Sequence, residues 1–360
     1  MARTRLRDLD ISIGTFPTGQ HNAITDVPGV WVGHHTLIYD EPRIARTGVT
    51  VIVPREGAIY KDAAFAGFHS FNGCGEMTGL PWLEESGFLT SPVAITNTNQ
   101  VGVVRDAIVE YGADEHGDFA FKLPVVAETY DGWLNDIDAF HLTKTHIYQA
   151  LQSATTGPAL EGNVGGGAGM ICHEFKGGIG TASRLVDTPS GRYTLGALVQ
   201  ANYGDRAFLR VNGVPVGQEI GPEHTPTPWG EPPVTGSIIV ILATDAPLLP
   251  VQCKRLARRA TVGLARVGGV GHNGSGDIFL AFATGNHLPA QARTLLDLKM
   301  LPHQHLNPIF EAVAEAVEEA ILNALTAAET MTGFRGHTAH ALPLDELQRV
   351  MDKYRPARQV

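Results

Sequence analysis

Long apolar runs and clusters of basic residues are both missing from this sequence of 360 residues. No segment approaches the roughly 20 apolar residues that a membrane-spanning helix requires, and no apolar stretch of signal-peptide length follows the first residues. The net charge is −10, and no basic run could displace counterions from a nucleic-acid backbone. The sequence therefore predicts a cytoplasmic protein that binds neither a membrane nor a nucleic acid.

Patterns typical of disulfides and metal sites are also scarce. The three cysteines, Cys74, Cys172 and Cys253, are odd in number and far apart, which predicts small buried side chains and no disulfide framework. None of the 15 histidines belongs to a His-Glu-x-x-His pattern or to a convincing zinc-binding set. We therefore expect no metal and no other cofactor.

Glycine, in contrast, is abundant. Its 41 residues make up roughly eleven per cent of the chain, where about seven per cent is usual. A fold so rich in glycine must turn tightly or bring backbones close together at many places. The remaining composition, with 43% hydrophobic and 18% charged residues, is typical of a globular protein that buries a substantial core.

Short apolar runs bounded by turn residues predict six β-strands. They span residues 30–38, 48–53, 92–96, 193–202, 237–244 and 277–284. Several of these runs are continuously apolar, which is typical of strands in a sheet that is covered on both faces.

Helical spacing of apolar residues predicts five helices. They span residues 102–111, 143–153, 247–267, 307–331 and 344–354. In the helix at 307–331, an apolar stripe begins at Ile309, Val313 and Val317 and leaves the glutamates largely outside it, as in a core-facing helix. Because strands and helices interleave without two separable apolar blocks, the sequence predicts a single α/β or α+β domain of layered sheets and helices.

The pair Gly236-Ser237 is distinguished by its surroundings. A Gly-Ser pair before a strand is ordinarily a turn. Here the pair separates a proline-rich stretch at 221–233 from a strongly apolar run at 238–244. The strand would hold Ser237 rigidly, while the constrained loop would strain the peptide bond before it.

Self-cleavage at this bond would make Ser237 an amino-terminal residue. The serine hydroxyl must attack the preceding carbonyl, and Gly236 offers no side-chain obstruction. Hydrolysis of the resulting ester would free an α-amine with an unperturbed pKa of about 7.7 to 8.0 on the nucleophile's own residue. Ser237 would then supply both the nucleophile and the general base. We therefore predict maturation into a chain of residues 1–236 and a chain of residues 237–360.

Six further segments, rich in glycine, follow one another along most of the chain. They are Ile24–Val30, Asn72–Gly79, Glu128–Gly132, Gly162–Gly167, Lys176–Thr181 and Gly274–Asp277. With the Gly-Ser junction, this series resembles the DmpA-type aminopeptidases, which include L-aminopeptidase/D-alanine esterase-amidases and β-peptidyl aminopeptidases. The resemblance implies an αββα sandwich related in architecture to the N-terminal nucleophile hydrolases, and a homotetramer of cleaved protomers.

The resemblance also implies roles for individual residues. It makes Ser237 the nucleophile, and it makes Tyr130 and Asn202 the groups that stabilise the oxyanion. Ser275 and Asp277 match a pair that supports the nucleophile, although the related enzymes carry Glu where this chain has Asp277. Tyrosine and asparagine are neutral donors suited to a developing oxyanion. Taken without the resemblance, the sequence favours a structural role for each, Tyr130 as a core aromatic residue and Asn202 as the end of a strand.

Glu128 matches a family carboxylate that receives the free ammonium group of the substrate. The predicted function is therefore that of an aminopeptidase and amidase, which releases amino-terminal L-α, D-α or β-amino acids from small peptides, amides or esters through an acyl-enzyme. One alternative is an acyltransferase of the ornithine acetyltransferase type, which uses a threonine nucleophile. Another is an uncleaved, inactive binding protein of the same fold.

Two other glycine and serine patterns are set aside. The run at 162–169 has neither the Lys-Ser/Thr ending of a phosphate-binding loop nor the glycine spacing of a dinucleotide-binding fold, so we expect it to line the cleft. No Gly-x-Ser-x-Gly elbow surrounds Ser237 or Ser275, which argues against an α/β-hydrolase.

Overall fold

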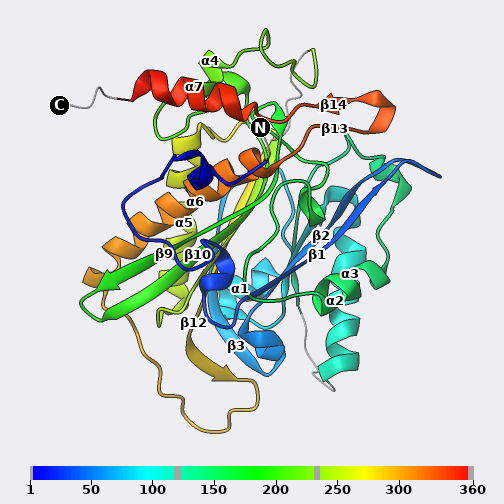
Figure 1. Ribbon diagram of the computed structural model, residues 1–360. Helices are drawn as coiled ribbons and strands as arrows, with labels where there is room; N and C mark the ends of the chain where they lie inside the picture. Colours follow the sequence, from blue (N-terminus) through cyan, green and yellow to red (C-terminus); the bar gives the residue numbers. More distant parts are fainter. Residues whose placement is uncertain (1–2, 117–122, 231–235, 356–360) are drawn as a thin grey trace, which may run out of the picture.

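A computed structural model describes residues 3–116, 123–230 and 236–355 of the chain. Two β-sheets lie face to face at its centre, and pairs of helices cover their outer faces (Figure 1). The last three residues of the proline-rich stretch at 221–233, and the two residues that follow it, lie outside the described residues. None of the helices in the described ranges combines the length and the apolar character needed to cross a membrane.

The larger sheet has six strands and carries the predicted site. In spatial order these are β4 (Phe88–Leu89), β3 (Asp62–Gly73), β12 (Ser275–Pro289), β11 (Gly236–Thr244), β10 (Gly191–Asn202) and β9 (Gly178–Thr188). The smaller sheet has four strands, in the order β1 (Trp31–Tyr39), β2 (Ala45–Val53), β5 (Val93–Asn97) and β6 (Val125–Thr129).

Each sheet contains one parallel pair of strands joined through a helix. Helix α5 (Pro250–Val267) connects β11 to the parallel strand β12, and α2 (Val101–His116) connects β5 to β6. A parallel pair needs such a crossover because the chain must return to the same end of the sheet. In the larger sheet this return brings the starts of β11 and β12 together at one edge.

Strand β11 is apolar from Ile238 to Ala243 because both of its faces are buried. Ile238, Val240 and Leu242 point into the core under α5 and α6 (Asn307–Ala327). The alternate residues Ile239 and Ile241 belong to the core between the two sheets. Both faces of the strand are therefore buried, as the sequence predicts.

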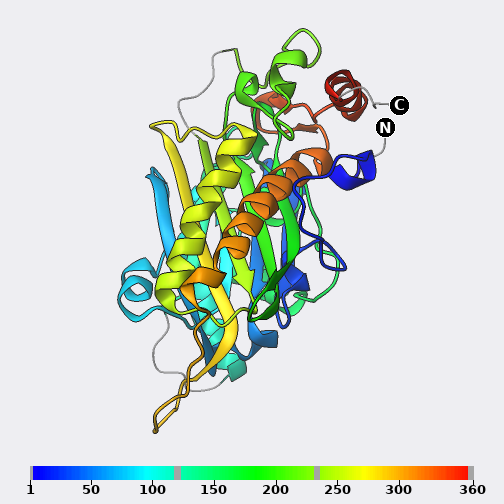
Figure 2. The same cartoon turned by 90° about the vertical axis from the view of Figure 1, so that its left-hand side faces the viewer.

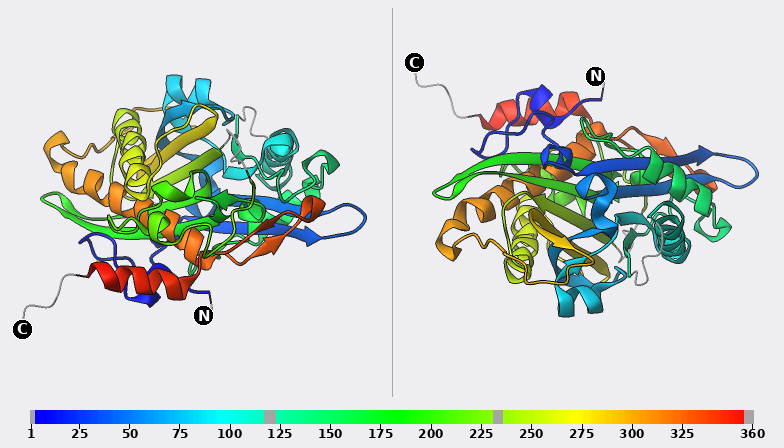
Figure 3. Two further views of the ribbon diagram at one scale, coloured as in Figure 1. Left: turned by 90° about the horizontal axis from the view of Figure 1, so that it is seen from above. Right: turned by 90° about the horizontal axis from the view of Figure 1, so that it is seen from below.

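The helices complete four layers. Helices α5 and α6 lie side by side over the larger sheet (Figure 2), while α2 and α3 (Lys144–Gln152) pack on the outer face of the smaller sheet. Viewed along the layers, the order is helices, sheet, sheet, helices (Figure 3). The αββα sandwich implied by the sequence is confirmed.

The six predicted strands and five predicted helices are all present, with bounds shifted by a few residues. Three further strands, β3, β6 and β9, are not among the predicted elements. Strand β3 is rich in alanine and glycine and β9 begins Gly178-Ile179-Gly180, residue types that have low strand propensity. These segments become strands because they pair with neighbours within a sheet. The predicted helix at 307–331 ends at Ala327, and Met331 already starts β13 (Met331–Thr332).

The remaining α-helices and strands of the described residues are short or lie at the periphery. They are α1 (Leu80–Ser86), α4 (Val216–Glu219), α7 (Leu344–Tyr354), β7 (Ile171–Cys172), β8 (Phe175–Lys176) and β14 (Thr338–Ala339). All three cysteines are free. The predicted burial is confirmed for Cys172 and Cys253 and is wrong for Cys74, which is exposed in the loop after β3.

The glutamates of α6 that lie outside its apolar stripe are mostly buried as well. Glu315 and Glu319 accept bonds from the guanidinium of Arg184 on β9, at 3.0 and 2.7 Å. Arg7, from the amino-terminal segment, binds Glu319 at 2.7 Å. Helix α6 is therefore enclosed by the sheet on one side and the amino-terminal segment on the other, with its charges neutralised inside the protein.

Candidate active site

The predicted site residues meet where three strands end or begin at one edge of the larger sheet. Ser237, the second residue of β11, pairs in register with Asn202 at the end of β10 and with Gly276 near the start of β12. Strand β10 is antiparallel to β11, and β12 is parallel to it. This topology brings together residues that lie far apart in the sequence.

The Ser237 side chain lies against the peptide bond that precedes it. Its hydroxyl donates to the carbonyl oxygen of Gly236 at 2.6 Å, and its Oγ accepts the backbone N–H of Gly276 at 3.4 Å. Ser237 is only 5% exposed, so its hydroxyl is held between two backbone groups. A side chain at Gly276 would approach the carbonyl oxygen of Cys74 to 2.6 Å, which explains the need for glycine beside the serine.

Ser275 and Asp277 form a hydrogen-bonded pair on the strand next to Ser237. The Ser275 hydroxyl donates to the Asp277 carboxylate at 2.6 Å, and both residues are almost fully buried. Burial raises the pKa of Asp277, while the hydrogen bond from Ser275, a bond from the Ile238 N–H and the nearby His272 act in the opposite direction. The shorter aspartate therefore reaches the serine hydroxyl without difficulty.

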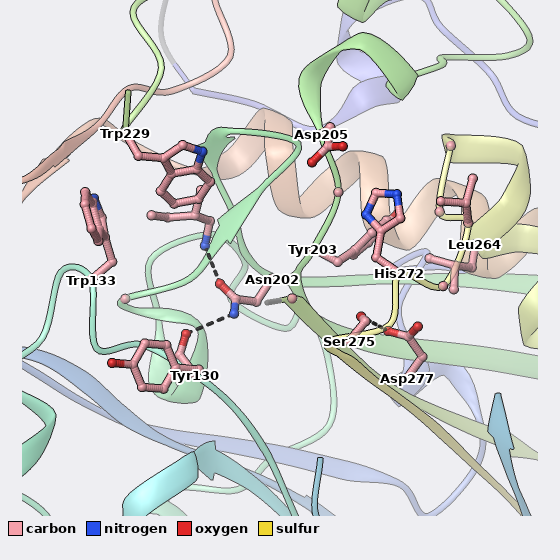
Figure 4. A pocket seen from close by; sticks show the side chains of 18 residues that line it. Tyr130, Trp133, Asn202, Tyr203, Asp205, Trp229, Leu264, His272, Ser275 and Asp277 are labelled. Atoms are coloured by element: carbon pink, nitrogen blue, oxygen red, sulfur yellow. Dashed lines mark hydrogen bonds between the residues drawn. The ribbon is translucent and has the colours of Figure 1, made fainter. Parts of the chain in front are cut away.

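A cavity of about 280 Å³ opens at this edge of the sheet (Figure 4). Five of the seven predicted site residues line it, namely Tyr130, Asn202, Gly236, Ser275 and Asp277. Its volume lies near the lower end of the range for small-molecule sites, about 300 to 1,000 Å³. The cavity therefore suits a short substrate.

Asn202 is oriented by hydrogen bonds at both ends of its side-chain amide. Its Oδ1 accepts the Ile171 N–H at 2.8 Å, and its Nδ2 donates to the carbonyl oxygen of Tyr130 at 2.9 Å. These bonds fix which end of the amide carries the donors, and they turn the NH₂ group toward the Tyr130 loop (Figure 4). Asn202 is the last residue of strand β10, and its side chain also lines the cavity.

Tyr130 follows the last residue of β6 and is 48% exposed, so it is not a core aromatic residue. Its ring covers Gly132, where an added Cβ would lie 2.3 Å from the tyrosine hydroxyl. The hydroxyl points away from Asn202 in Figure 4. A role at the oxyanion therefore requires a different rotamer of Tyr130.

Ser237 and Glu128 are the two predicted site residues that do not line the cavity. Ser237 is buried directly beside the lining residue Gly236, whereas Glu128 lies on another strand, β6. Its Oε1 accepts the Glu76 N–H at 2.9 Å, and its Oε2 accepts the Thr98 hydroxyl. Glu128 is 3% exposed, and burial raises the pKa of its carboxyl. It forms no ion pair with any residue in the described part of the chain. Its carboxylate is bonded to neutral donors only.

Several cavity residues carry no signal in the sequence. The rings of Trp133 and His337 stack at 3.8 Å, and Trp229 meets Trp133 edge-on at 5.6 Å. Both tryptophans line the cavity, although nearly a hundred residues separate them. His272 lines the opposite side, three residues before Ser275. Only the fold shows that these side chains share one site.

The glycine-rich run at 162–169 does not line the cleft as predicted. Residues Gly165–Gly167 are buried in a 3-10 turn, and only Gly169 reaches the cavity. The turn packs against β2 and β9, where added side chains would collide with backbone atoms. The glycines therefore serve close packing more than substrate contact.

Comparison with known proteins agrees with this geometry. Residues 22–339 match peptidase family S58. The chain belongs to this family. It is 49% identical to the beta-peptidyl aminopeptidase BapA of Sphingosinicella microcystinivorans, over 98% of this chain and 92% of the relative.

Solved structures give the same result. A beta-aminopeptidase from Burkholderia sp. matches with a TM-score of 0.92 and 51% identity, covering 98% of this chain and 100% of its own. The L-aminopeptidase D-Ala-esterase/amidase of Ochrobactrum anthropi matches with a TM-score of 0.92 and 46% identity, covering 97% and 98% of the two chains. That enzyme is described as a prototype for the serine aminopeptidases and a new variant of the Ntn hydrolase fold.

These findings confirm the DmpA-type resemblance. The S58 chain is a hydrolase, a serine aminopeptidase and amidase of the N-terminal nucleophile type. Membership of a peptidase family decides against the acetyltransferase alternative.

Proposed function

We propose that the chain cuts itself between Gly236 and Ser237, and that Ser237 then acts as the amino-terminal nucleophile of the aminopeptidase. One observation carries this proposal: the Ser237 hydroxyl donates to the carbonyl oxygen of Gly236 at 2.6 Å. The attacking oxygen is therefore already beside the carbonyl group that it must attack. The bond between the Gly236 carbon and the Ser237 nitrogen would break, and an ester to Oγ would form.

Hydrolysis of that ester completes maturation. Water would add the hydroxyl of a new carboxyl group to Gly236 and return the proton to Ser237 Oγ. The products are residues 1–236 and residues 237–360, which stay together because β11 lies inside the sheet between β10 and β12. Ser237 then carries both a free amine and a hydroxyl.

In the mature enzyme, the Ser237 amine accepts the hydroxyl proton as Oγ attacks the substrate carbonyl. The same amine then protonates the leaving amine, and water releases the acyl group by the reverse sequence. The Asn202 amide, with Tyr130 in a rotated position, donates to the oxyanion. The Ser275–Asp277 pair supports the nucleophile from the adjacent strand.

The substrate class follows from charge and from the relatives. Glu128 is a buried carboxylate that no cation of the described residues binds, which is the environment in which a substrate ammonium would be most favourable. It lies close to Ser275, since the Asn72–Gly79 segment bonds to both residues, through Glu76 and Cys74. Because the relatives at 49% and 51% identity are β-aminopeptidases, β-aminoacyl amides and short peptides are the proposed substrates.

A denaturing gel combined with amino-terminal sequencing tests the proposal directly. Freshly purified, active protein should give two bands, and the smaller one should begin Ser-Ile-Ile-Val. A single full-length band in active protein would overturn the N-terminal serine mechanism and favour the alternative of an uncleaved protein. Assembly into a homotetramer and location in the cytoplasm stay predictions.

A further inference from the structure

A lysine with an unusual environment lies in the interior behind Asn202. Lys176, in β8, is 0% exposed, and its ammonium donates to the carbonyl oxygens of Gly167, Met170 and Gly177 at 3.3, 2.9 and 2.8 Å. Its three N–H donors therefore have three acceptors. It pairs with no carboxylate in the described part of the chain. The buried charge is satisfied by peptide dipoles alone.

One of these peptide groups connects Lys176 to the active site. The carbonyl oxygen of Met170 accepts the lysine ammonium, and the N–H of the same peptide group, which belongs to Ile171, donates to Asn202 Oδ1 at 2.8 Å. The amide of Asn202 continues the series, because its Nδ2 donates toward the cavity side at Tyr130. Two amide groups therefore stand in line between the ammonium and the cavity.

A chain of this kind polarises in one direction. A cation at the carbonyl oxygen withdraws electron density from the peptide nitrogen and makes its N–H a stronger donor, and each amide passes the effect to the next. The effect is largest away from water, and Lys176, Met170 and Ile171 are all buried. The Asn202 NH₂ group becomes a better donor to a developing negative charge.

We propose that Lys176 is a positioning residue for the oxyanion site: through the Met170–Ile171 peptide it fixes the orientation of the Asn202 amide and strengthens its donor. This inference rests on the proposed oxyanion role of Asn202. It explains why a cation is buried here without a carboxylate, although such burial is costly and an apolar side chain would fill the space more cheaply. Lys176 itself touches neither the substrate nor the reacting atoms.

A double-mutant cycle tests the connection. Asn202→Ala, Lys176→Met and the double variant are assayed for kcat and KM on a β-aminoacyl p-nitroanilide at pH 6, where Lys176 carries its proton because burial lowers its pKa only to about 7. The value of kcat is normalised to the cleaved fraction on a gel. Asn202→Ala should lower kcat by about 10² to 10³. Lys176→Met should lower kcat by about tenfold or more with little change in KM, and it should have almost no further effect in the Asn202→Ala background.

A second substitution separates charge from structure. Lys176→Gln keeps an amide donor for the loop but removes the charge, so it should fold, mature and still show the loss in kcat. Full activity of Lys176→Gln would reduce the lysine to a structural contact and overturn the proposal. If Lys176→Met does not accumulate as folded protein, Lys176→Gln takes its place in the cycle.

The matched control is Gln252→Met in α5. Gln252 is also 0% exposed and donates to a backbone carbonyl, that of Leu301 at 2.7 Å, but it has no link to Asn202. It should lower stability without changing kcat. Losses from Lys176→Met and Asn202→Ala that simply multiply would overturn this inference alone. An Asn202→Ala variant with unchanged kcat would instead refute the oxyanion role in the proposed function.

Discussion

Arg184 and Lys176 are both fully buried cations, one in β9 and the other just before it, yet their surroundings are opposite. Arg184 lies between the larger sheet and helix α6, in the layer that we call the outer core, and contacts two carboxylates of α6, Glu315 and Glu319. Lys176 lies beside the active site, and among the described residues its ammonium group is hydrogen-bonded to three peptide carbonyls and to no carboxylate. The outer core neutralises its buried charge, and the site does not.

The buried carboxylates of the outer core and of the active site differ in the same way as the two cations. Burial alone would raise the pKa of Glu319, but its bonds with Arg7 and Arg184 lower it. Within residues 3–116, 123–230 and 236–355, neither Glu128 nor Asp277 forms an ion pair, and burial raises the pKa of both carboxyls. Proteins usually pair charges that they bury, and departures from this rule are concentrated at functional sites. The unpaired charges at this sheet edge are therefore available to the substrate and the reaction.

Removing the nucleophile should abolish the chemistry of the active site and leave the outer core intact. Ser237→Ala lacks the hydroxyl needed for both steps, so we expect a full-length chain and no measurable hydrolysis. The ionic network of the outer core is untouched, so the variant should fold and unfold cooperatively. Intact mass, a p-nitroanilide assay and circular dichroism on heating check the three expectations. Residual hydrolysis by the alanine variant would place the nucleophile elsewhere.

Breaking the ion pairs of the outer core should lower stability and leave the activity unchanged. Arg184→Met removes the cation that binds Glu315 and leaves Glu319 with Arg7 alone. Removing one partner of a buried pair typically costs about 3 to 5 kcal/mol. The free energy of unfolding in urea should fall by that order, while kcat per cleaved molecule should not change.

A surface pair on the same hairpin provides the control. Arg192 binds Asp187 at 2.7 Å but its side chain is 62% exposed, so Arg192→Met should leave the free energy of unfolding almost unchanged. A large loss of kcat in Arg184→Met at near-normal stability would contradict the division into a neutralised core and an active edge.

The unpaired carboxylate of Glu128 predicts a requirement for a free substrate amine. An N-acetylated aminoacyl p-nitroanilide should have a kcat/KM about 30-fold or more below that of the free amine, which corresponds to about 2 kcal/mol for a buried charge left unpaired. Glu128→Gln should narrow this difference because the carboxylate is absent. Equal rates for the two substrates with wild-type enzyme would rule out the ammonium role and indicate a general amidase.

The sequence predicts elements well where burial is visible in the pattern. Strand β11 is recognisable because apolar residues occupy both of its faces, and Ser237 and Asn202 fall at ends of predicted strands. Strands β3 and β9 are missed, since alanine and glycine form strands there only through pairing with neighbours. Local pattern carries no information about such pairing.

The sequence predicts which residues belong to the site, but it does not predict how their side chains are arranged. Motif resemblance selects residues that line the cavity, such as Asn202 and Asp277. It does not reveal that Tyr130 points away from Asn202, or that Glu128 lies behind the cavity wall. Lys176 belongs to the segment Lys176–Thr181 that contributes to the family resemblance, yet its contact with the Met170 carbonyl depends on tertiary packing. Side-chain direction and long-range contacts are properties of the assembled fold.

The contrast between paired and unpaired cations also predicts how stability depends on pH. Burial without a carboxylate lowers the pKa of Lys176 from 10.5 to about 7, while the nearby Cys172 thiol has its pKa raised to about 12 by burial. Between pH 7 and 10.5 the unfolded chain keeps the lysine proton and the folded chain does not. The unfolded state thus binds more protons, so this group makes stability rise with pH across that window. Below pH 7 both states are protonated and the cost of the buried charge is constant.

Lys176→Met carries no titrating group at this position, which isolates the effect. The difference in the free energy of unfolding between this variant and wild type should favour the variant most near pH 6, and it should shift toward wild type as the pH rises to about 9.5. Urea unfolding of both proteins at several pH values measures it, and titrations common to both cancel in the difference. Parallel curves would mean that the Lys176 pKa is ordinary. Such a result would mean that a carboxylate neutralises Lys176, as Glu315 and Glu319 neutralise Arg184. The two buried cations would then not differ in their surroundings.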